Sequence, residues 1–484
     1  MDAILPLLFL ALLVLPAAHC LPSPRQSYHL ELARVDALDT ESLNLTDHEL
    51  LRRAIQRSRD RLASITPRVS PSRNRNKVVV AEAPVLSAGG EYQVRLGMGT
   101  PQHSFTAVID TASDLIWTQC QPCVKCYKQR DPVFNPVAST TYAVVPCNSD
   151  TCDELDTHRC GSSGSSGDDE DDVCQYTYTY GGNATTRGTL AVDRLAMGDD
   201  VFRGVVFGCS SSSAGVPPAQ VSGVVGLGRG PLSLVSQLSV RRFMYCLPPA
   251  VSRRAGRLVL GADATAVRNA SDKIVVPMTT NPRYPNYYYL NLDGLSIGDR
   301  AMTMVRSRSS SRSRSSRNNA TPGSSTNSSS EAAASPPVSD DDGDGSGGTG
   351  PDAYGMIIDI ASTITFLEES LYDELVDDLE EEIRLPRGSG STLGLDLCFI
   401  LPEGVRMSRV YAPQVSMAFE GEWVRFDKEK VFVEDRKAGM MCLMMGKTDG
   451  VSILGNYQQQ NMQVMYNLRR QRITFVKADC ESVP

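Results

Sequence analysis

The chain repeats one short pattern, and this repeat limits the fold more than any other feature. The segments VIDTASDLIW and IIDIASTITF each place an aspartate, Asp110 and Asp359, after an apolar run and before small residues. Farther along each half, an apolar pair precedes a glycine, at Gly226 and Gly455. A strand, an acidic turn, further strands and an apolar–Gly element thus occur twice in the same order. This order predicts two similar β lobes that bring the two carboxylates together across a cleft.

From Glu91 onward, the sequence has the pattern of short β-strands. Segments such as EYQVRLGMGTP alternate in polarity and end in turns rich in Gly, Pro, Asn or Asp. Residues 368–383 are an exception, because their leucines recur every four residues and predict a helix. Residues 306–350, and a shorter run at 161–172, are of low complexity. We expect disordered loops there, since such sequences cannot bury enough apolar surface to become ordered.

Size and charge narrow the class of protein. A length of 484 residues fits two lobes, and 41% hydrophobic residues are enough for packed cores. The formal net charge of −8 argues against a nucleic-acid partner, because phosphate binding needs a basic face.

Residues 1–20 have the pattern of a secretory signal peptide. The apolar run from Ile4 to Leu15 is too short to span a bilayer as a helix, and small residues follow it before Cys20. A membrane anchor is the alternative. The signal-peptide interpretation predicts a protein of the secretory pathway that has no membrane partner.

Residues 21–80 predict a propeptide. They include an arginine-rich stretch, DHELLRRAIQRSRDRLASI, with apolar residues at helical spacing. The chain before Val78 has 11 basic and 8 acidic residues, whereas the remainder has 37 basic and 48 acidic residues. A cationic segment ahead of an anionic body favours electrostatic docking that cleavage or acid would reverse. The alternative is a solvated helical arm with no regulatory role.

The cysteines agree with secretion. Thirteen are present, and twelve remain once Cys20 is removed with or near the signal. An even number in an oxidising compartment predicts six disulfides. A metal site in CQPCVKC is disfavoured, because no second CxxC or His pair matches it, so we expect neither a metal nor another cofactor. Asparagines in Asn-x-Ser/Thr sequences are candidate glycosylation sites: Asn44, Asn183, Asn269, Asn319 and Asn327.

Together these motifs resemble the pepsin-type aspartic endopeptidases, in particular their plant nepenthesin-like branch. The resemblance covers residues 78–482 apart from the low-complexity insert. It rests on the two Asp motifs and on YTYTYGGNATTRGTL, GEWVRFDKEKVFVED and ILGNYQQQNMQVMYNL, together with a cysteine-rich stretch at 120–174 that is similar to an insertion of that branch.

The resemblance implies an all-β, bilobal pepsin-like fold with lobes at 81–275 and 276–484. It implies a monomer that acts on proteins or peptides, in the apoplast or, as the alternative, the vacuole. Its implied site residues are the catalytic Asp110 and Asp359, the supporting Thr111, Ser113, Ser362 and Trp117, and the flap residues Tyr180 and Gly181. Its implied disulfides are Cys398–Cys442 and, at the chain end, Cys246–Cys480.

The implied chemistry explains why two aspartates are needed. A water held between the carboxylates attacks the peptide carbonyl after one carboxylate takes its proton, while the other, protonated, donates to the carbonyl oxygen. Aspartic proteases are the standard example of two close carboxylates that share a proton, because both cannot ionise cheaply. The two titrate as a unit, so the sequence assigns neither role to one aspartate.

Several positions depart from the family motif. Ala112 and Ala361 stand where the family has glycine, and GGNA replaces the usual GDGS of the flap. Ile360 has no hydroxyl, so the reciprocal hydrogen bonds that hydroxyls at 111 and 360 make between the lobes cannot both form. We therefore expect Ile360 to be the main handicap of the site, and serine there to raise turnover by restoring the hydrogen bond to Thr111. The alternative interpretation is that Ile360 packs well, and that serine would leave a cavity.

Two functions follow. The favoured one is an acid endopeptidase, because both aspartates, the serines after them and the flap tyrosine are retained. The alternative is a catalytically weak or inactive binding protein on the same fold, resembling plant xylanase inhibitors, which the altered glycines and Ile360 favour.

Overall fold

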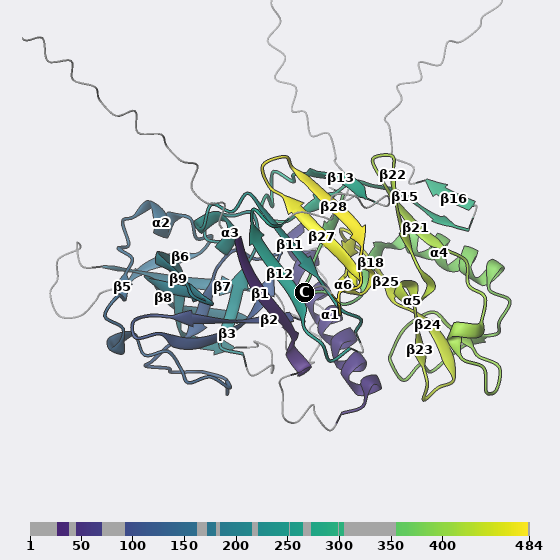
Figure 1. Ribbon diagram of the computed structural model, residues 1–484, viewed down its shortest axis with the longest axis horizontal. Coiled ribbons are helices and arrows are strands. Elements are labelled where there is room, and N and C mark those ends of the chain that lie inside the picture. Colours follow the sequence, from purple (N-terminus) through teal and green to yellow (C-terminus); the bar gives the residue numbers. More distant parts are fainter. Residues whose placement is uncertain are drawn as a thin grey trace, which may run out of the picture.

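The computed structural model confirms the all-β, two-lobed architecture, and Figure 1 shows the lobes side by side. The residues that it describes are 27–37, 45–69, 92–161, 172–180, 184–214, 221–250, 252–264, 273–298, 300–303 and 355–482. Several predicted features lie outside these residues: the signal peptide at 1–20, the insert at 306–350, most of the loop at 161–172, the flap residue Gly181, and Asn44, Asn183, Asn269, Asn319 and Asn327.

The N-terminal lobe is built from mainly antiparallel strands and a few short helices. Its strands are β2 (Tyr92–Met98), β3 (His103–Asp110), β4 (Trp117–Gln119), β5 (Ala143–Val144), β6 (His158–Gly161), β7 (Val173–Thr179), β8 (Thr185–Met197), β9 (Asp200–Ala214) and β10 (Gly223–Gly226). Its helices are α2 (Asp150–Asp153), α3 (Leu234–Gln237) and a 3-10 turn at Pro136–Ala138.

The C-terminal lobe is also built mainly from β-strands, and one of its helices is longer than those of the N-terminal lobe. Its strands are β14 (Tyr289–Leu290), β15 (Leu292–Ile297), β16 (Arg300–Thr303), β17 (Met356–Ile358), β18 (Thr365–Glu368), β19 (Arg387–Gly388), β20 (Cys398–Ile400), β21 (Val415–Phe419), β22 (Glu422–Phe426), β23 (Phe432–Asp435), β24 (Met440–Leu443), β25 (Met445–Thr448) and β26 (Ile453–Leu454). Its helices are α4 (Glu369–Glu382), α5 (Lys428–Val431), α6 (Asn456–Gln459) and a 3-10 turn at Met407–Arg409. The helix predicted at 368–383 is α4, whose leucines face the core.

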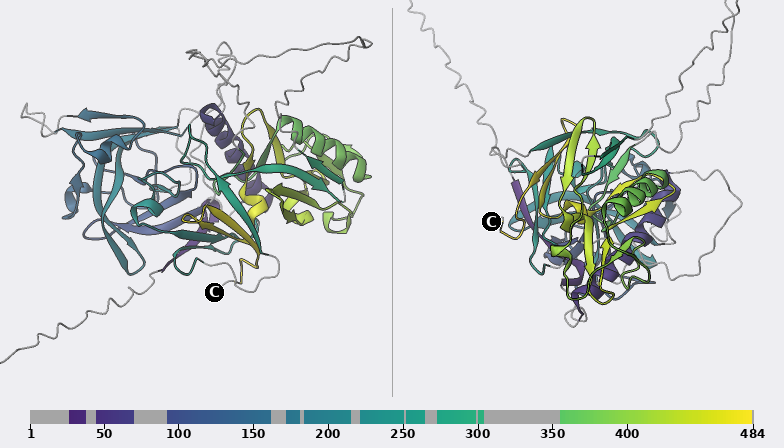
Figure 2. Two further views of the ribbon diagram at one scale, coloured as in Figure 1. Left: turned by 90° about the horizontal axis from the view of Figure 1, so that it is seen from above. Right: turned by 90° about the vertical axis from the view of Figure 1, so that its right-hand side faces the viewer.

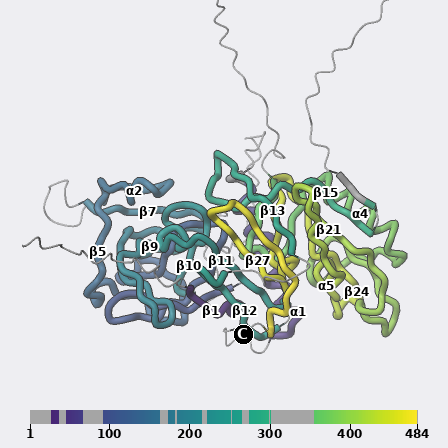
Figure 3. Tube along the Cα trace, turned by 45° about the horizontal axis from the view of Figure 1, so that its top comes forward, coloured from purple at the N-terminus to yellow at the C-terminus, as the bar shows by residue number. Residues whose placement is uncertain are grey.

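A central sheet joins the two lobes. Its strands follow one another in the order β1 (Ser27–Arg34), β12 (Gly256–Gly261), β11 (Arg242–Cys246), β27 (Met462–Asn467), β28 (Arg472–Lys477) and β13 (Ile274–Thr279), all antiparallel. Figure 3 shows β11 and β27 running side by side through the middle of the molecule. The largest buried apolar cluster continues through this sheet from one lobe into the other. The N-terminal segment therefore enters the fold as an edge strand of the central sheet.

The internal repeat appears as the same strand arrangement in both lobes. In the N-terminal lobe β10 runs parallel to β3, with Gly226 opposite Asp110, and antiparallel to β4. In the C-terminal lobe β26 runs parallel to β17 and antiparallel to β18. Each acidic turn thus leaves a strand that is held by the partner strand carrying the apolar–Gly element.

Helix α1 (Asp47–Val69) lies between the lobes (Figure 2). It begins with a capping box, in which the Thr46 hydroxyl accepts the Glu49 amide N–H at 3.3 Å and the Glu49 carboxylate accepts the Thr46 amide N–H at 2.9 Å. Leu51, Ile55 and Ile65 on its apolar face are buried against the C-terminal lobe. Packing of this face, rather than helix propensity alone, stabilises an element of this kind.

All twelve cysteines of the body form disulfides. The six bonds are Cys120–Cys209, Cys123–Cys126, Cys147–Cys160, Cys152–Cys174, Cys246–Cys480 and Cys398–Cys442. The cysteines of CQPCVKC therefore serve as cross-links. Within the described ranges no cluster of three or more His, Cys, Asp or Glu side chains has the geometry of a metal site.

We predict that the disulfide between Cys246 and Cys480 stabilises the fold more than the one between Cys123 and Cys126. The first closes a loop of 234 residues and the second a loop of 3, and a cross-link removes more chain entropy from the unfolded state when its loop is longer. Replacing both cysteines of the long loop by alanine should lower the free energy of unfolding by about 2–5 kcal/mol. The matched double variant of the short loop should lose about 1–2 kcal/mol. Urea unfolding at neutral pH that gave the same loss of unfolding free energy for the two double variants would contradict this prediction.

Candidate active site

Asp110 ends strand β3, and its carboxylate is fixed by its own turn. The Ala112 amide N–H donates to Asp110 Oδ1 at 2.9 Å, and the Leu227 N–H donates to the Asp110 carbonyl at 2.7 Å. The residue is only 2% exposed. Alanine at 112 thus still supplies the amide donor expected from the family glycine.

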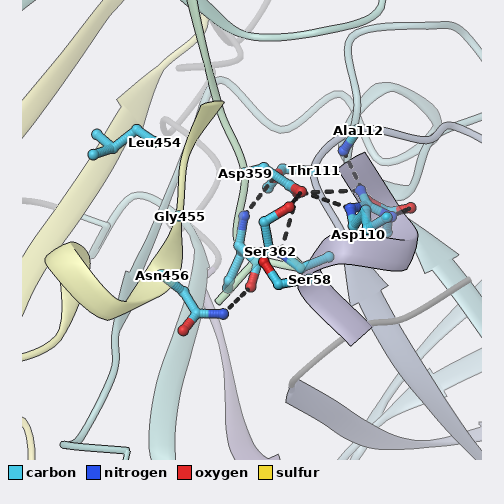
Figure 4. A network of polar contacts seen from close by, with 12 residues as sticks. Ser58, Asp110, Thr111, Ala112, Asp359, Ser362, Leu454, Gly455 and Asn456 are labelled. Atoms are coloured by element: carbon cyan, nitrogen blue, oxygen red, sulfur yellow. Dashed lines mark hydrogen bonds and ion pairs between the residues drawn. The ribbon is translucent and has the colours of Figure 1, made fainter. Parts of the chain in front are cut away.

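Asp359 follows β17 and has a fuller set of donors. Its Oδ1 accepts the Ala361 amide N–H at 3.1 Å, and its Oδ2 accepts the Ser362 hydroxyl at 2.7 Å. The Asp359 amide N–H donates to the Leu454 carbonyl at 3.1 Å. The residue is completely buried. Figure 4 shows Asp110 and Asp359 turned toward one another from the two lobes.

The lobes are joined at this point by Thr111. Its hydroxyl accepts the Ile360 amide N–H at 3.1 Å and lies 3.4 Å from Asp359 Oδ1, within reach to donate to it. This is half of the reciprocal arrangement described above. The other half needs a hydroxyl at position 360, where the side chain is instead an isoleucine with no exposed surface, packed in the main core.

The two serines differ. Ser362 bonds the outer oxygen of its aspartate, as the resemblance implies, whereas the Ser113 hydroxyl has no hydrogen-bond partner within the described ranges. The oxygens of Asp110 are instead contacted by the Ala112 amide and by an arginine. The serine support implied for Asp110 is therefore not formed in this state of the molecule.

Trp117 and Tyr180 meet as the resemblance implies. The Trp117 indole N–H donates to the Tyr180 hydroxyl at 2.7 Å, and both side chains are buried. Burial raises the pKa of Tyr180 well above its usual value, and nearby Tyr178 and Asp110 add to this. Tyr180 is therefore a neutral hydroxyl throughout the acid range.

Arg61 of α1 occupies the space between the two carboxylates. Its Nη2 lies 2.5 Å from Asp110 Oδ1 and its Nε lies 2.6 Å from Asp359 Oδ2. Nη2 also donates to Asp359 Oδ1 at 3.1 Å, so one guanidinium bonds both aspartates. Burial alone would lower the pKa of Arg61, but the charges of Asp110 and Asp359 raise it above its usual value. The arginine is therefore a permanent cation at the centre of the site.

Other contacts hold the part of α1 that precedes Arg61 in place. The Ser58 hydroxyl, one turn before it, accepts the Ile364 amide N–H at 2.9 Å. Near the start of the helix, His48 Nε2 lies 2.6 Å from the Thr392 hydroxyl and 3.4 Å from Asp435. The helix is thus fixed to the C-terminal lobe from its first turn to the turn before Arg61.

A cavity of about 480 Å³ opens beside the aspartates. Ala112 and Asp114 line one side of it, Tyr178 of the strand before the flap another, and Tyr284 and Tyr287 the side toward the C-terminal lobe. Burial raises the pKa of Asp114 to about 7, against the hydrogen bond from the Gly230 amide, and Asp110 contributes to the rise. The cavity is thus lined by tyrosine and threonine side chains together with Arg283, Asp156 and Asp114, and the carboxyl group of Asp114 is neutral in acid.

The sequence located the aspartates, Thr111, Ser362, Trp117 and Tyr180 but not the arginine between them. Arg61 is one of several arginines at helical positions, and nothing in the sequence distinguishes it from its neighbours. Which face of the helix turns toward the cleft follows from the packing of Leu51 and Ile55, and that packing brings Ser58 and Arg61 to the active-site turns.

Comparisons with known proteins agree with this geometry. Residues 92–262 match the family model described as Xylanase inhibitor N-terminal, and residues 349–477 match Xylanase inhibitor C-terminal. Over 99% of both chains, the protein is 65% identical to Aspartyl protease 37 of Oryza sativa subsp. japonica. It is 34% identical to Aspartic proteinase nepenthesin-1 of Nepenthes gracilis, over 90% of this chain and 87% of that one.

Solved structures with this fold include Basic 7S globulin from soybean. It superposes with a TM-score of 0.59 at 18% identity, covering 95% of this chain and 99% of the globulin. The structure of edgp superposes with a TM-score of 0.58 at 16% identity, covering 94% of this chain and 95% of that one. At these identities the likeness shows the fold alone.

We predict that Ile360→Ser destabilises the protein. The serine hydroxyl would gain about 0.5–1.5 kcal/mol from one hydrogen bond. Emptying a fully buried isoleucine site costs about 2–5 kcal/mol. The structure therefore favours the second of the two interpretations of Ile360, and the melting temperature should fall. Ile360→Val, which removes one methylene, should cost about 1 kcal/mol. A melting temperature for Ile360→Ser at or above that of the wild type would show that the missing hydroxyl matters more than packing.

Proposed function

We propose that Asp110 and Asp359 are the catalytic dyad of this chain, which belongs to the plant pepsin-like aspartic proteases. The chain is an aspartic-type endopeptidase that hydrolyses peptide bonds. The observation that supports the dyad assignment is the simultaneous contact of one guanidinium with both carboxylates, which requires them to face the same point.

In the proposed mechanism, a water takes the position between the carboxylates once Arg61 has left. One carboxylate removes a proton from this water as it attacks the peptide carbonyl, and the other donates a proton to the carbonyl oxygen. The Ala112 and Ala361 amides and the Ser362 hydroxyl orient the dyad. Tyr180, held by Trp117, closes over the substrate, and the cavity beside Ala112 accepts a substrate side chain.

The alternative is a binding protein without catalysis, as the names of the matching family models allow. The retained donors to both carboxylates favour the enzyme, because a binding protein has no need of two buried acids aimed at one point. Burying two carboxylates costs free energy, and a binding protein has no catalytic function that requires this cost.

We further propose that residues 21–80 are an inhibitory propeptide and that the intact chain is a zymogen. Its described parts are strand β1 in the central sheet and helix α1 in the cleft, where Arg61 takes the place of the catalytic water. The guanidinium stays charged at all working pH values, so the ion pairs are lost only when the carboxylates gain protons. Docking is then strong at neutral pH and weakens as the pH falls.

The cellular location of the protein is part of the same proposal. Six disulfides fit an oxidising compartment, and we place the protein in the secretory pathway, as a monomer exported to the apoplast or held in the vacuole. In the part of the chain that the structure describes, no helix is long and apolar enough to cross a membrane. Protein or peptide substrates are the expected partners.

The dyad is tested by removing one acid at a time. Asp110→Asn and Asp359→Asn should each abolish hydrolysis of denatured globin after acid treatment, because an amide can neither accept nor share the proton. The exposed Asp449→Asn is the matched control and should retain wild-type turnover. The activity of the wild type should be highest at an acidic pH, and pepstatin should block it. Full activity in either dyad variant would rule out this mechanism.

The zymogen is tested at Arg61. Arg61→Met keeps most of the volume but leaves two buried carboxylates facing each other, and loss of one partner from a buried ion pair costs about 3–5 kcal/mol. At a mildly acidic pH, processing of the chain should be at least about tenfold faster than in the wild type. Arg59→Met, which removes the hydrogen bond to the Gly394 carbonyl and leaves the dyad untouched, is the control. Gel analysis that found equal processing in all three proteins would show that Arg61 does not restrain the site.

A further inference from the structure

The two catalytic turns are supported by different residues at one equivalent position. Gly226 and Gly455 both let a strand pass very close to a catalytic turn, since a Cβ atom would lie 2.2 Å from the Asp114 carbonyl oxygen or 2.4 Å from that of Ile364. The residue after each glycine is Leu227 in the N-terminal lobe but Asn456 in the C-terminal lobe. An apolar side chain is thus compatible with this position, and the amide calls for an explanation.

Asn456 is fully buried and bonds the turn twice. Its Nδ2 donates to the Ile360 carbonyl at 2.8 Å, and its backbone N–H donates to the Ser362 carbonyl at 2.6 Å. Figure 4 shows its side chain reaching toward the turn that carries Asp359 and Ser362. Its Oδ1 has no hydrogen-bond partner in the described part of the molecule. A buried acceptor without a partner costs about 1–3 kcal/mol, so an amide at this position is less favourable for stability than an apolar side chain.

Gln459, one turn along α6, supports the same loop from behind. Its Nε2 donates to the Leu454 carbonyl at 2.9 Å and lies 3.4 Å from the Asp359 carbonyl. Its Oε1 accepts the hydroxyl of Tyr245 in the central sheet. The C-terminal catalytic turn therefore rests on buried amides that connect it to the sheet between the lobes.

We propose that Asn456 is a positioning residue for catalysis, which supplies to the Asp359 turn the restraint that a hydroxyl at position 360 would otherwise give. The proposal rests on the assignment of Asp110 and Asp359 as the dyad. The peptide group before Ile360 is held by Thr111 of the opposite lobe, through the Ile360 N–H. The peptide group after it is held by Asn456, through the Ile360 carbonyl. With both peptide groups fixed, Asp359 keeps its orientation although the side chain at 360 makes no polar contact.

Two variants of Asn456 separate positioning from simple packing. Asn456→Leu installs the residue of the N-terminal lobe and removes the donor at every pH. We expect kcat to fall about tenfold and KM to stay within about twofold, because substrate binding does not use this side chain. The exposed Asn135→Leu is the matched control and should leave both constants unchanged.

Asn456→Asp tests the donor itself. When protonated, the new carboxyl can donate to the Ile360 carbonyl, so kcat at the lowest pH should stay close to that of the wild type. When ionised, it has no donor and repels both that carbonyl and Asp359. The alkaline limb of the kcat profile should therefore move toward acid by at least about half a pH unit. A residue that only fills space would not produce this shift.

Hydrogen exchange of the intact chain at neutral pH gives a readout that needs no activity. In Asn456→Leu, amides of residues 357–364 should exchange at least about tenfold faster than in the wild type, while those of β27 stay unchanged. If the wild type hydrolyses nothing, the proposed function fails, and the exchange result still decides the role of Asn456. Unchanged exchange at 357–364, or a lowered melting temperature with kcat and its pH profile unaltered, would overturn the proposal.

Discussion

The site depends on two carboxylates that are held close together where almost no water reaches them. Asp110 and Asp359 are 2% and 0% exposed, and two such anions in a protein interior repel each other and lose their hydration. In the intact chain the guanidinium of Arg61 offsets this by bonding both. The same cation, together with the packing of Leu51 and Ile55 and the contact of Ser58, holds α1 between the lobes.

The lobes are similar in topology and unequal in chemistry. Both present an aspartate from a strand that is flanked in the same way. Among the residues that the structure describes, however, a serine donates to Asp359 and not to Asp110, and a buried side-chain amide holds the turn after Asp359 and not the turn after Asp110. The missing hydroxyl at position 360 is compatible with a working site because the main chain there is restrained by Thr111 on one side and Asn456 on the other. The departures at positions 112 and 361 matter less, because the donors used there are backbone amides.

Much of this could be predicted from the sequence, for reasons that are local. The repeat around Asp110 and Asp359 predicted the two lobes, because periodicity and turn residues encode strands directly. The Trp117–Tyr180 contact was expected only from the resemblance. Arg61 and Asn456 could not be singled out, since their roles depend on which face of α1 turns to the cleft and on how closely β26 passes the Asp359 turn. Both follow from packing between segments that are far apart in the chain.

We propose that α1 closes a competent dyad in the intact chain and that acid processing opens it. Calorimetric titration with pepstatin, which binds where the catalytic water and the scissile bond sit, tests this most directly. The account predicts one pepstatin bound per chain after acid processing has removed β1 and α1, and no binding to the intact chain at neutral pH. Equal binding by the intact chain would contradict closure of the cleft by Arg61, and no binding by the processed chain would contradict the dyad.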